Sequence, residues 1–411
     1  MFEHDPTDPH EVGLNAERLE AIPEYFRENY IDTGKLPCMA TLVSRGGEIA
    51  LEDYSGTTEM GAGEHIGPHT IFRIYSMTKP ITSLAAMMLF EEGKLRLDHD
   101  VSRYIPEFAD VMVWDAGDKD SFTTRKPDRP MKVLDLFTHT SGITYGFMMQ
   151  HPVDFLYRQE KIGRPDETLQ AMAKRLAALP LQCSPGTEWW YGHSIDVLGA
   201  IVEVVSGMEL DEFFRQRITG PLGMHDTEFW VPEEKIDRLM ACYQKDAETG
   251  VTSLADGAGA ASKLYTKRPT LLNAGGGLVS TLRDYHRFAL MLLRGGTLDG
   301  QRFVSPKTVE FMRQNHLPGG KTMRDMGKSM FTEVMADGVG FGLGGSVVVD
   351  VVAGQQPGSE GTFSWGGLAS TFFWIDPEEE IIAIQATQLM PSSTYPMRQQ
   401  FQQLVYAAID W

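Results

Sequence analysis

The sequence of 411 residues is 42% hydrophobic and 23% charged, an ordinary composition for a globular protein with a sizeable core. Its formal net charge of −19 argues against nucleic acid and anionic membrane surfaces as partners. No segment reaches the roughly 18 uninterrupted apolar residues of a membrane span, and the first residues lack the basic and apolar regions of a signal peptide. We therefore expect a cytoplasmic protein that acts on a small molecule.

The first third of the chain contains predicted helices and strands in alternation. Residues 12–33 have the spacing of an amphipathic helix, and residues 39–54 read as two strands joined at Gly46-Gly47. A short strand is expected at 71–75. It is followed by a helix whose apolar residues recur at helical spacing until Gly93 ends the pattern.

The middle of the chain has loops and helices, and strand patterns return near its end. The clearest helical runs are 169–179, 194–206 and 210–217, whereas the strand-like runs are 346–349, 371–375 and 381–384. Residues 397–408 again place apolar side chains on one helical face.

This order predicts an α+β fold. One antiparallel sheet is expected to combine N- and C-terminal segments and to be flanked by the terminal helices, with a mainly helical domain inserted between them. We expect residues 12–410 to form one unit, with an α/β subdomain of 1–75 and 271–411 and a mainly helical subdomain of 76–270. A cleft between the two parts is the expected place for a ligand site.

Ser76 and Lys79 are the first candidate catalytic pair. They are three residues apart at the start of a predicted helix, where i and i+3 side chains are neighbours with Cβ atoms about 5–6 Å apart. A serine hydroxyl becomes a nucleophile when a base removes its proton, and a buried lysine amine can be that base. An S-x-x-K tetrapeptide alone is weak support, because most such tetrapeptides are solvated helix turns.

Two further segments carry chemistry-bearing residues. Tyr191 precedes the predicted helix at 194–206, although a tyrosine in such a loop more often packs than reacts. Trp365-Gly366-Gly367 lies where a strand could line the cleft, and its glycines allow close approach of the backbone to a ligand.

Other motifs are set aside. Residues 192–196 lack the second glycine of a G-x-S-x-G elbow, and the glycine-rich run 340–345 leads into a strand instead of the helix of a dinucleotide site. The three cysteines (Cys38, Cys183 and Cys242) form no C-x-x-C pair or disulfide framework. No histidine pattern of a zinc site is present, so we interpret His139 and His193 as structural residues and expect no metal.

Four motifs together resemble those of the serine β-lactamase and penicillin-binding superfamily, and more narrowly of the family VIII carboxylesterases. The similarity in order and spacing covers residues 12–410. The motifs are Ser76-Met77-Thr78-Lys79, Leu136-Phe137-Thr138-His139-Thr140-Ser141-Gly142, Tyr191-Gly192-His193 with Asp196-Val197-Leu198-Gly199, and Trp365-Gly366-Gly367.

The resemblance implies a role for each matching residue. Ser76 is the expected nucleophile, Lys79 its base partner, and Tyr191 shares proton transfer with that lysine. The backbone N–H groups of Ser76 and Leu368 would form the oxyanion hole. The residues expected to line the substrate pocket are Tyr145, His193, Trp365, Gly366 and Gly367. No cofactor is implied.

Two departures from the superfamily pattern favour an esterase. Trp365 stands in place of the lysine of Lys-Thr-Gly, and His193 in place of the asparagine of Tyr-x-Asn. Without that lysine, the carboxylate of a β-lactam loses a charge-assisted contact, whereas an apolar wall suits a neutral ester. We therefore expect a serine carboxylesterase that acts on short- to medium-chain esters through an acyl-enzyme.

Three alternatives remain open at this stage. The first is a β-lactamase or D-Ala-D-Ala peptidase, and the second is an acyltransferase that uses the same serine. The third is a catalytically silent binding or scaffold protein on the same fold. The joint presence of serine, lysine and tyrosine disfavours the third.

Overall fold

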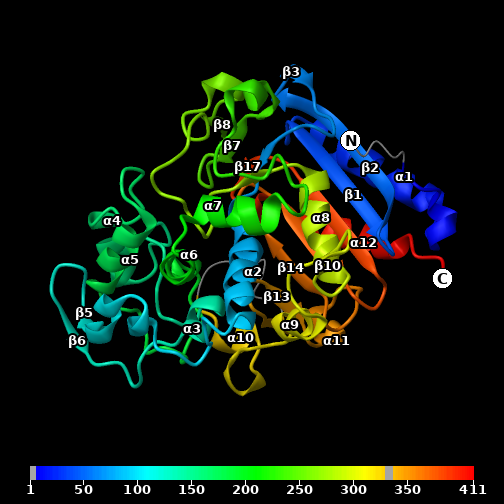
Figure 1. The fold of residues 1–411 in the computed structure, drawn as a ribbon. Coiled ribbons are helices and arrows are strands. Elements are labelled where there is room, and N and C mark those ends of the chain that lie inside the picture. The colour runs from blue at the N-terminus through cyan, green and yellow to red at the C-terminus, as the bar shows by residue number, and fades with distance from the viewer. Residues whose placement is uncertain (1–5, 329–336) are drawn as a thin grey trace.

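The computed structural model describes residues 6–328 and 337–411. Within these residues, the main sheet has eight antiparallel strands in the order β12-β13-β14-β15-β16-β1-β2-β3. Their bounds are β1 Cys38–Arg45, β2 Glu48–Glu59, β3 Ala62–His65, β12 Val339–Phe341, β13 Ser346–Val348, β14 Phe363–Gly366, β15 Phe372–Asp376 and β16 Ile381–Ala386. The first strand of the chain therefore pairs with one of the last, with Leu42 opposite Ile384 (Figure 1).

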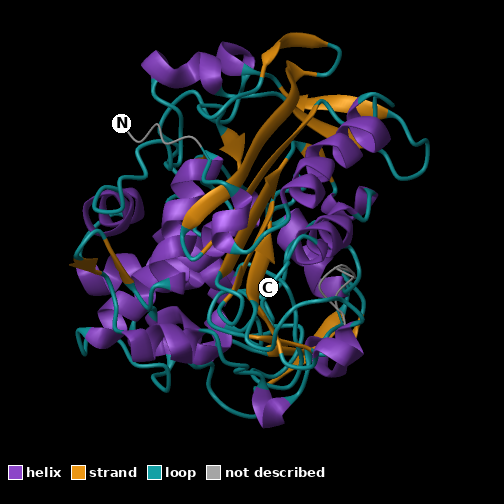
Figure 2. Ribbon diagram, turned by 90° about the vertical axis from the view of Figure 1, so that its right-hand side faces the viewer, coloured by secondary structure: helices purple, strands orange, loops and turns teal. Residues whose placement is uncertain are grey.

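Helices cover both faces of this sheet (Figure 2). On one face, α1 (Ala16–Phe26) packs beside α12 (Met397–Ala407), and α8 (Leu282–Leu293) contacts β15 and β16 on the other. Alternate residues of β16 belong to two different core clusters, since Ile381 faces the terminal helices and Ile382 the opposite side. Burial of this strand on both faces agrees with its apolar run Ile381-Ile382-Ala383-Ile384.

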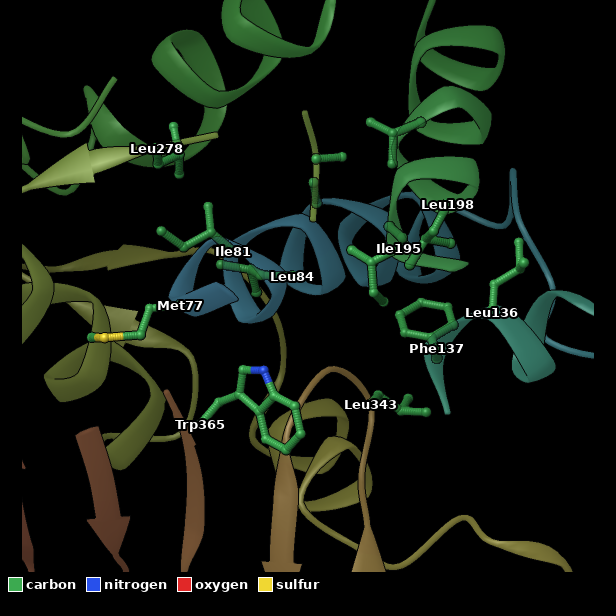
Figure 3. Close-up of a cluster of buried hydrophobic side chains, with 14 of the residues drawn as sticks. Met77, Ile81, Leu84, Leu136, Phe137, Ile195, Leu198, Leu278, Leu343 and Trp365 are labelled. Carbon is green, nitrogen blue, oxygen red and sulfur yellow. The ribbon is translucent and has the colours of Figure 1, made fainter. Parts of the chain in front are cut away.

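The rest of the molecule is built around α2 (Thr78–Glu91). Its residues are buried from Thr78 through Leu89, polar ones such as Lys79 and Thr82 included. α6 (Ser194–Ser206) packs against α2, and Figure 3 shows their apolar side chains meeting those of Phe137 and Leu343. The neighbouring helices are α3 Val133–Phe137, α4 Pro152–Gln159, α5 Leu169–Ala177 and α7 Leu210–Phe214.

The fold class predicted from the sequence is confirmed, with several local differences. The predicted helix 12–33 is α1 followed by a π turn at Arg27–Ile31, and α2 begins at Thr78 because Ser76 lies in a 3₁₀ turn at Tyr75–Met77. The predicted strand at 71–75 is reduced to β4, Phe72–Arg73. The helix 194–206 is confirmed to the residue.

The segment expected to be loops and helices also contains two hairpins. They are β5 Val113–Gly117 with β6 Phe122–Arg125, and β7 Cys242–Lys245 with β8 Thr252–Asp256. β17 (Leu389–Met390) pairs in parallel with β7, so the C-terminal part of the chain contacts this segment as well. The remaining elements are β9 Val279–Ser280, β10 Thr297–Leu298, β11 Gln301–Arg302, α9 Pro306–Met312, α10 Met323–Met326 and α11 Val351–Gly354. In the part of the chain that the structure describes, every helix is too short or too polar to cross a membrane.

Candidate active site

Ser76 lies between β4 and α2, in the 3₁₀ turn that leads into the helix. β4 is paired with β9, which fixes the approach to this turn. Tyr75, directly before Ser76, has a φ of 42°, a left-handed conformation that a residue with a large side chain rarely adopts. Strained backbone of this kind gathers at functional sites, where the surrounding structure holds it in place.

Lys79 is fully buried and reaches back to the serine. Its Nζ lies 2.9 Å from Ser76 Oγ and donates a hydrogen bond to the carbonyl oxygen of Gly275 at 2.6 Å. The ring of Tyr191 lies 4.6 Å from Nζ, measured to the ring centroid. The structure therefore brings the three residues expected to be catalytic into one cluster.

Trp365 supplies the fourth contact of this cluster. Its indole Nε1 donates to the hydroxyl oxygen of Tyr191 at 3.2 Å, and in Figure 3 this nitrogen is turned towards α2. Because an indole N–H can only donate, the Tyr191 oxygen is the acceptor and its own proton points elsewhere. A neutral donor thus stands where the superfamily pattern has a cationic lysine.

Three residues of this cluster, Ser76, Tyr191 and Trp365, line a cavity of about 450 Å³. Predicted site residues that line it are Ser76, Tyr145, Tyr191, Trp365, Gly366, Gly367 and Leu368. His193 is not among the lining residues. Its ring packs edge-on against Tyr145, with centroids 4.5 Å apart, and its Nδ1 lies 2.8 Å from the buried carboxylate of Asp196. It therefore stands behind the cavity wall, which corrects the expectation that it lines the pocket.

The placement of Leu368 follows from the glycine before it. Gly367 N–H donates to the carbonyl of Thr371 at 2.9 Å, which closes the turn after β14. A Cβ at Gly367 would come within 2.4 Å of the Ile74 carbonyl oxygen, so only glycine lets this turn lie against the segment that precedes Ser76. Leu368 and Ser76 then share one cavity, as an oxyanion hole made of their two amides requires.

Sequence reasoning missed two residues behind Lys79. Asp196, in the first turn of α6, accepts a hydrogen bond from the Gly275 N–H at 2.9 Å, and Gly275 in turn accepts from Lys79. Gly275 belongs to the run Asn273-Ala274-Gly275-Gly276-Gly277, whose three consecutive glycines are a sequence signal of close backbone approach. Asp196 belongs to one of the motifs that carry the family resemblance, but its place in the sequence indicates no more than a carboxylate at a helix start, which is a common capping position.

The two ionisable rings beside the cluster are held neutral. Burial, reinforced by Lys79, lowers the pKa of His139 well below its ordinary value. Burial also raises the pKa of Tyr145 well above its ordinary value, with Tyr191 and Asp196 adding to the effect. Both shifts favour the uncharged ring near neutral pH.

Comparison with known proteins places the chain in a family. A family model described as Beta-lactamase matches residues 24–407. Protein Rv1367c of Mycobacterium tuberculosis (strain ATCC 25618 / H37Rv) is 37% identical over 364 residues, which are 88% of each chain. Esterase EstB of Burkholderia gladioli is 29% identical over 382 residues, 90% of each chain.

A solved structure described as "EstCE1, a hydrolase with promiscuous acyltransferase activity" has the same fold. It superposes with a TM-score of 0.78 at 26% identity, and the match covers 95% of this chain and 99% of the other. The family model spans nearly the whole chain, including every residue of the cluster around Ser76. The chain therefore belongs to the Beta-lactamase family.

Proposed function

We propose that the protein is a serine carboxylesterase of the family VIII type, which hydrolyses short- to medium-chain carboxylic esters through an acyl-enzyme on Ser76. The observation that carries the proposal is the 2.9 Å contact between Lys79 Nζ and the Oγ of Ser76, a residue that lines an apolar cavity. The esterase activity in the name of EstB supports it.

In the acylation step, Ser76 Oγ attacks the ester carbonyl carbon while Lys79, assisted by Tyr191, accepts the hydroxyl proton. The carbonyl oxygen becomes an oxyanion, which the amides of Ser76 and Leu368 stabilise; such preorganised donors are usually a large part of catalysis. The tetrahedral intermediate then collapses, the C–O bond to the alcohol breaks, and Tyr191 delivers the proton to the leaving alcohol oxygen.

Deacylation uses the same groups in the reverse order. A water molecule gives its proton to the Lys79–Tyr191 pair and attacks the acyl carbon, and the second intermediate expels Ser76 Oγ. The proton returns to Ser76 and the carboxylic acid leaves. Atoms balance as ester plus water giving acid plus alcohol, with no other reactant required.

The cavity favours an ester over a β-lactam. Trp365 contributes an indole in place of a cation, and its N–H already donates to Tyr191. Arg398 also lines the cavity, but its guanidinium donates to the carbonyls of Gly367 and Thr371. Because Trp365 offers no cation and the Nη2 of Arg398 already donates to these carbonyls, we expect hydrolysis of a chromogenic cephalosporin to be slower than that of a simple ester.

The test is hydrolysis of p-nitrophenyl butyrate by wild type and Ser76→Ala. Removing the nucleophile should lower kcat by several orders of magnitude, on the order of 10⁴ or more. Ser83→Ala is a matched control, because Ser83 is a fully buried serine on the same helix whose hydroxyl has no hydrogen-bond partner among the residues that the structure describes. Undiminished turnover by Ser76→Ala would refute the assignment of the nucleophile.

Acyl transfer is a second candidate, favoured by the promiscuous acyltransferase activity of EstCE1. An alcohol acceptor would occupy the place of the departed alcohol and attack the acyl-Ser76 instead of water. Vinyl butyrate with benzyl alcohol as acceptor separates the two reactions by product analysis. Benzyl butyrate indicates transfer, whereas butyric acid alone indicates hydrolysis.

A further inference from the structure

Two large apolar side chains that line the cavity are exposed to solvent. Phe147 is 58% exposed and Leu264 is 62% exposed, although both belong to the lining of the cavity that contains Ser76. Single exposed apolar residues are ordinary on a protein surface. Here two of them, from segments more than 100 residues apart in the sequence, meet at one cavity beside a nucleophile.

Phe147 is the outer end of an aromatic wall. Its ring stacks on Tyr145, with centroids 4.8 Å apart and an interplanar angle of 17°. Tyr145 meets Tyr191 edge-on at 5.5 Å, and Tyr191 accepts the hydrogen bond from Trp365. The wall therefore runs without interruption from solvent to the group beside Lys79.

Leu264 is carried by a segment with a buried anchor. Next to it, Tyr265 packs its ring 5.3 Å from the guanidinium of Arg73 and donates its backbone N–H to Ser262 Oγ at 3.3 Å. Both Ser262 Oγ and Arg73 bond to the carboxylate of Asp256. Leu264 is therefore exposed to solvent although the segment that carries it is held in place by these contacts.

The aromatic wall of Tyr145 and Phe147 begins beside Tyr191, the residue proposed to protonate the leaving alcohol. If Tyr191 delivers that proton, the alcohol part of the ester lies on its side, and the next rings outward are Tyr145 and Phe147. We propose that Phe147 and Leu264 form a subsite for the alcohol part of the substrate, and that this part is an uncharged, ring-bearing group of about two fused or linked rings. The proposal rests on the esterase function proposed above.

Size and charge agree with such a group. A cavity of about 450 Å³ lies within the range of roughly 300–1,000 Å³ of pockets that bury drug-sized ligands. Within residues 6–328 and 337–411, no carboxylate lines the cavity, and Arg398 donates to backbone carbonyls. A flat apolar ring can stack on the exposed face of this wall, whereas a cationic alcohol would lose its hydration without a carboxylate partner.

The experiment compares 2-naphthyl butyrate with phenyl butyrate, which share the acyl group. We expect Phe147→Ala and Leu264→Ala to lower the ratio of kcat/KM for the naphthyl over the phenyl ester by about tenfold, the usual effect of lost apolar contact. Phe122→Ala is the control for Phe147, since Phe122 is an exposed ring stacked on Trp114 away from the cavity. Leu254→Ala, at a leucine that is 59% exposed, is the control for Leu264.

A second readout does not depend on turnover. Binding of 2-naphthol, followed by its fluorescence, should weaken in Phe147→Ala and Leu264→Ala and remain unchanged in the two controls. Equal ratios and equal naphthol binding in all five proteins would overturn the subsite while leaving the esterase function intact. Loss of naphthol binding in the two variants, without Ser76-dependent hydrolysis of either ester by wild type, would overturn the esterase function and leave the subsite.

Discussion

Lys79 is hydrogen-bonded to Gly275, and Gly275 is hydrogen-bonded to Asp196. The carboxylate accepts the Gly275 N–H, and the Gly275 carbonyl accepts from the amine that lies 2.9 Å from Ser76 Oγ. The other carboxylate oxygen of Asp196 lies 2.8 Å from His193 Nδ1. Asp196 reaches Lys79 through Gly275 and does not line the cavity, so it acts as a positioning residue for the base.

We expect Asp196→Ala to lower kcat for p-nitrophenyl butyrate by about 10²-fold with little change in KM, because small displacements of a catalytic group have effects of this size. Asp196→Asn should recover part of the rate, since its amide oxygen can still accept the Gly275 N–H. Steady-state kinetics at several pH values measures both effects.

Asp154→Asn is the matched control, because Asp154 is also fully buried and accepts hydrogen bonds from Thr144 and Gln182 outside the cavity. A loss of thermal stability without a change in kcat is expected there. Equal kcat losses in the Asp154 and Asp196 variants would contradict a specific role for Asp196.

The turn after β14 shows how an element positions the predicted oxyanion hole. Gly367 packs against Ile74 and Thr371 so closely that an added Cβ would lie 2.4 Å and 2.3 Å from their oxygen atoms. Gly367→Ala must therefore shift the turn and with it the amide of Leu368. We expect kcat to fall by about tenfold or more, in line with loss of an oxyanion donor. Gly67→Ala should leave kcat unchanged, because within residues 6–328 and 337–411 the added Cβ meets no atom within 4 Å beyond its own chain neighbours.

The helix α8 carries two buried titratable groups, His286 and Asp284, whose contributions to stability change with pH in opposite directions. Burial lowers the pKa of His286 from 6.5 to about 4 and raises the pKa of Asp284 from 3.8 to about 7. Between pH 4 and pH 6.5, His286 binds its proton more readily in the unfolded chain than in the folded chain. The contribution of His286 to stability therefore rises with pH over this range. The folded chain binds the Asp284 proton more readily, so that contribution falls as pH rises towards 7.

Removing one of these two groups should leave only the other group's effect on the pH dependence of stability. Asp284→Asn should make the protein gain stability from pH 4.5 to pH 6.5, by about 2 kcal/mol of unfolding free energy from His286. His286→Gln should make stability fall over the same range. Thermal melting of wild type and both variants at the two pH values gives the sign, and identical pH dependence in the three proteins would contradict the assignment.

At the scale of the whole molecule, the two ends of the chain complete one sheet layer. β1 pairs with β16, and α1 packs beside α12 on the same face (Figure 1). Phe401 of α12 is fully buried between Phe26 and Trp374, with ring centroids 6.1 Å and 5.2 Å away. Because Arg398 of the same helix lines the cavity, the C-terminal helix links the sheet face to the site.

Phe401→Ala should lower the free energy of unfolding by about 3–5 kcal/mol, the usual loss when a buried phenylalanine is truncated. Phe311→Ala, at a ring that is 36% exposed, should cost about 1 kcal/mol or less. Denaturant unfolding monitored by circular dichroism measures both, and similar losses for the two variants would contradict the role of Phe401 in the shared core.

Features that depend on residues close together in the chain could be predicted from the sequence. The pairing of Ser76 with Lys79 follows from the spacing of one helical turn, and the helix 194–206 follows from its apolar period. The order of strands at both ends and helices between them was enough to predict an α+β fold. Short hairpins such as β5–β6 were not predicted, because their strands are largely exposed and lack an apolar alternation.

The meeting of residues far apart in the chain is a property of the tertiary fold. Trp365 donates to Tyr191 across 174 positions of sequence, and Gly275 binds Asp196 across 79. The fold also turns His193 away from the cavity and brings Phe147 and Leu264 to its mouth. The physical reason is that such contacts depend on the path of the chain through the fold, whereas the spacing of residues along a helix or strand acts over only a few positions.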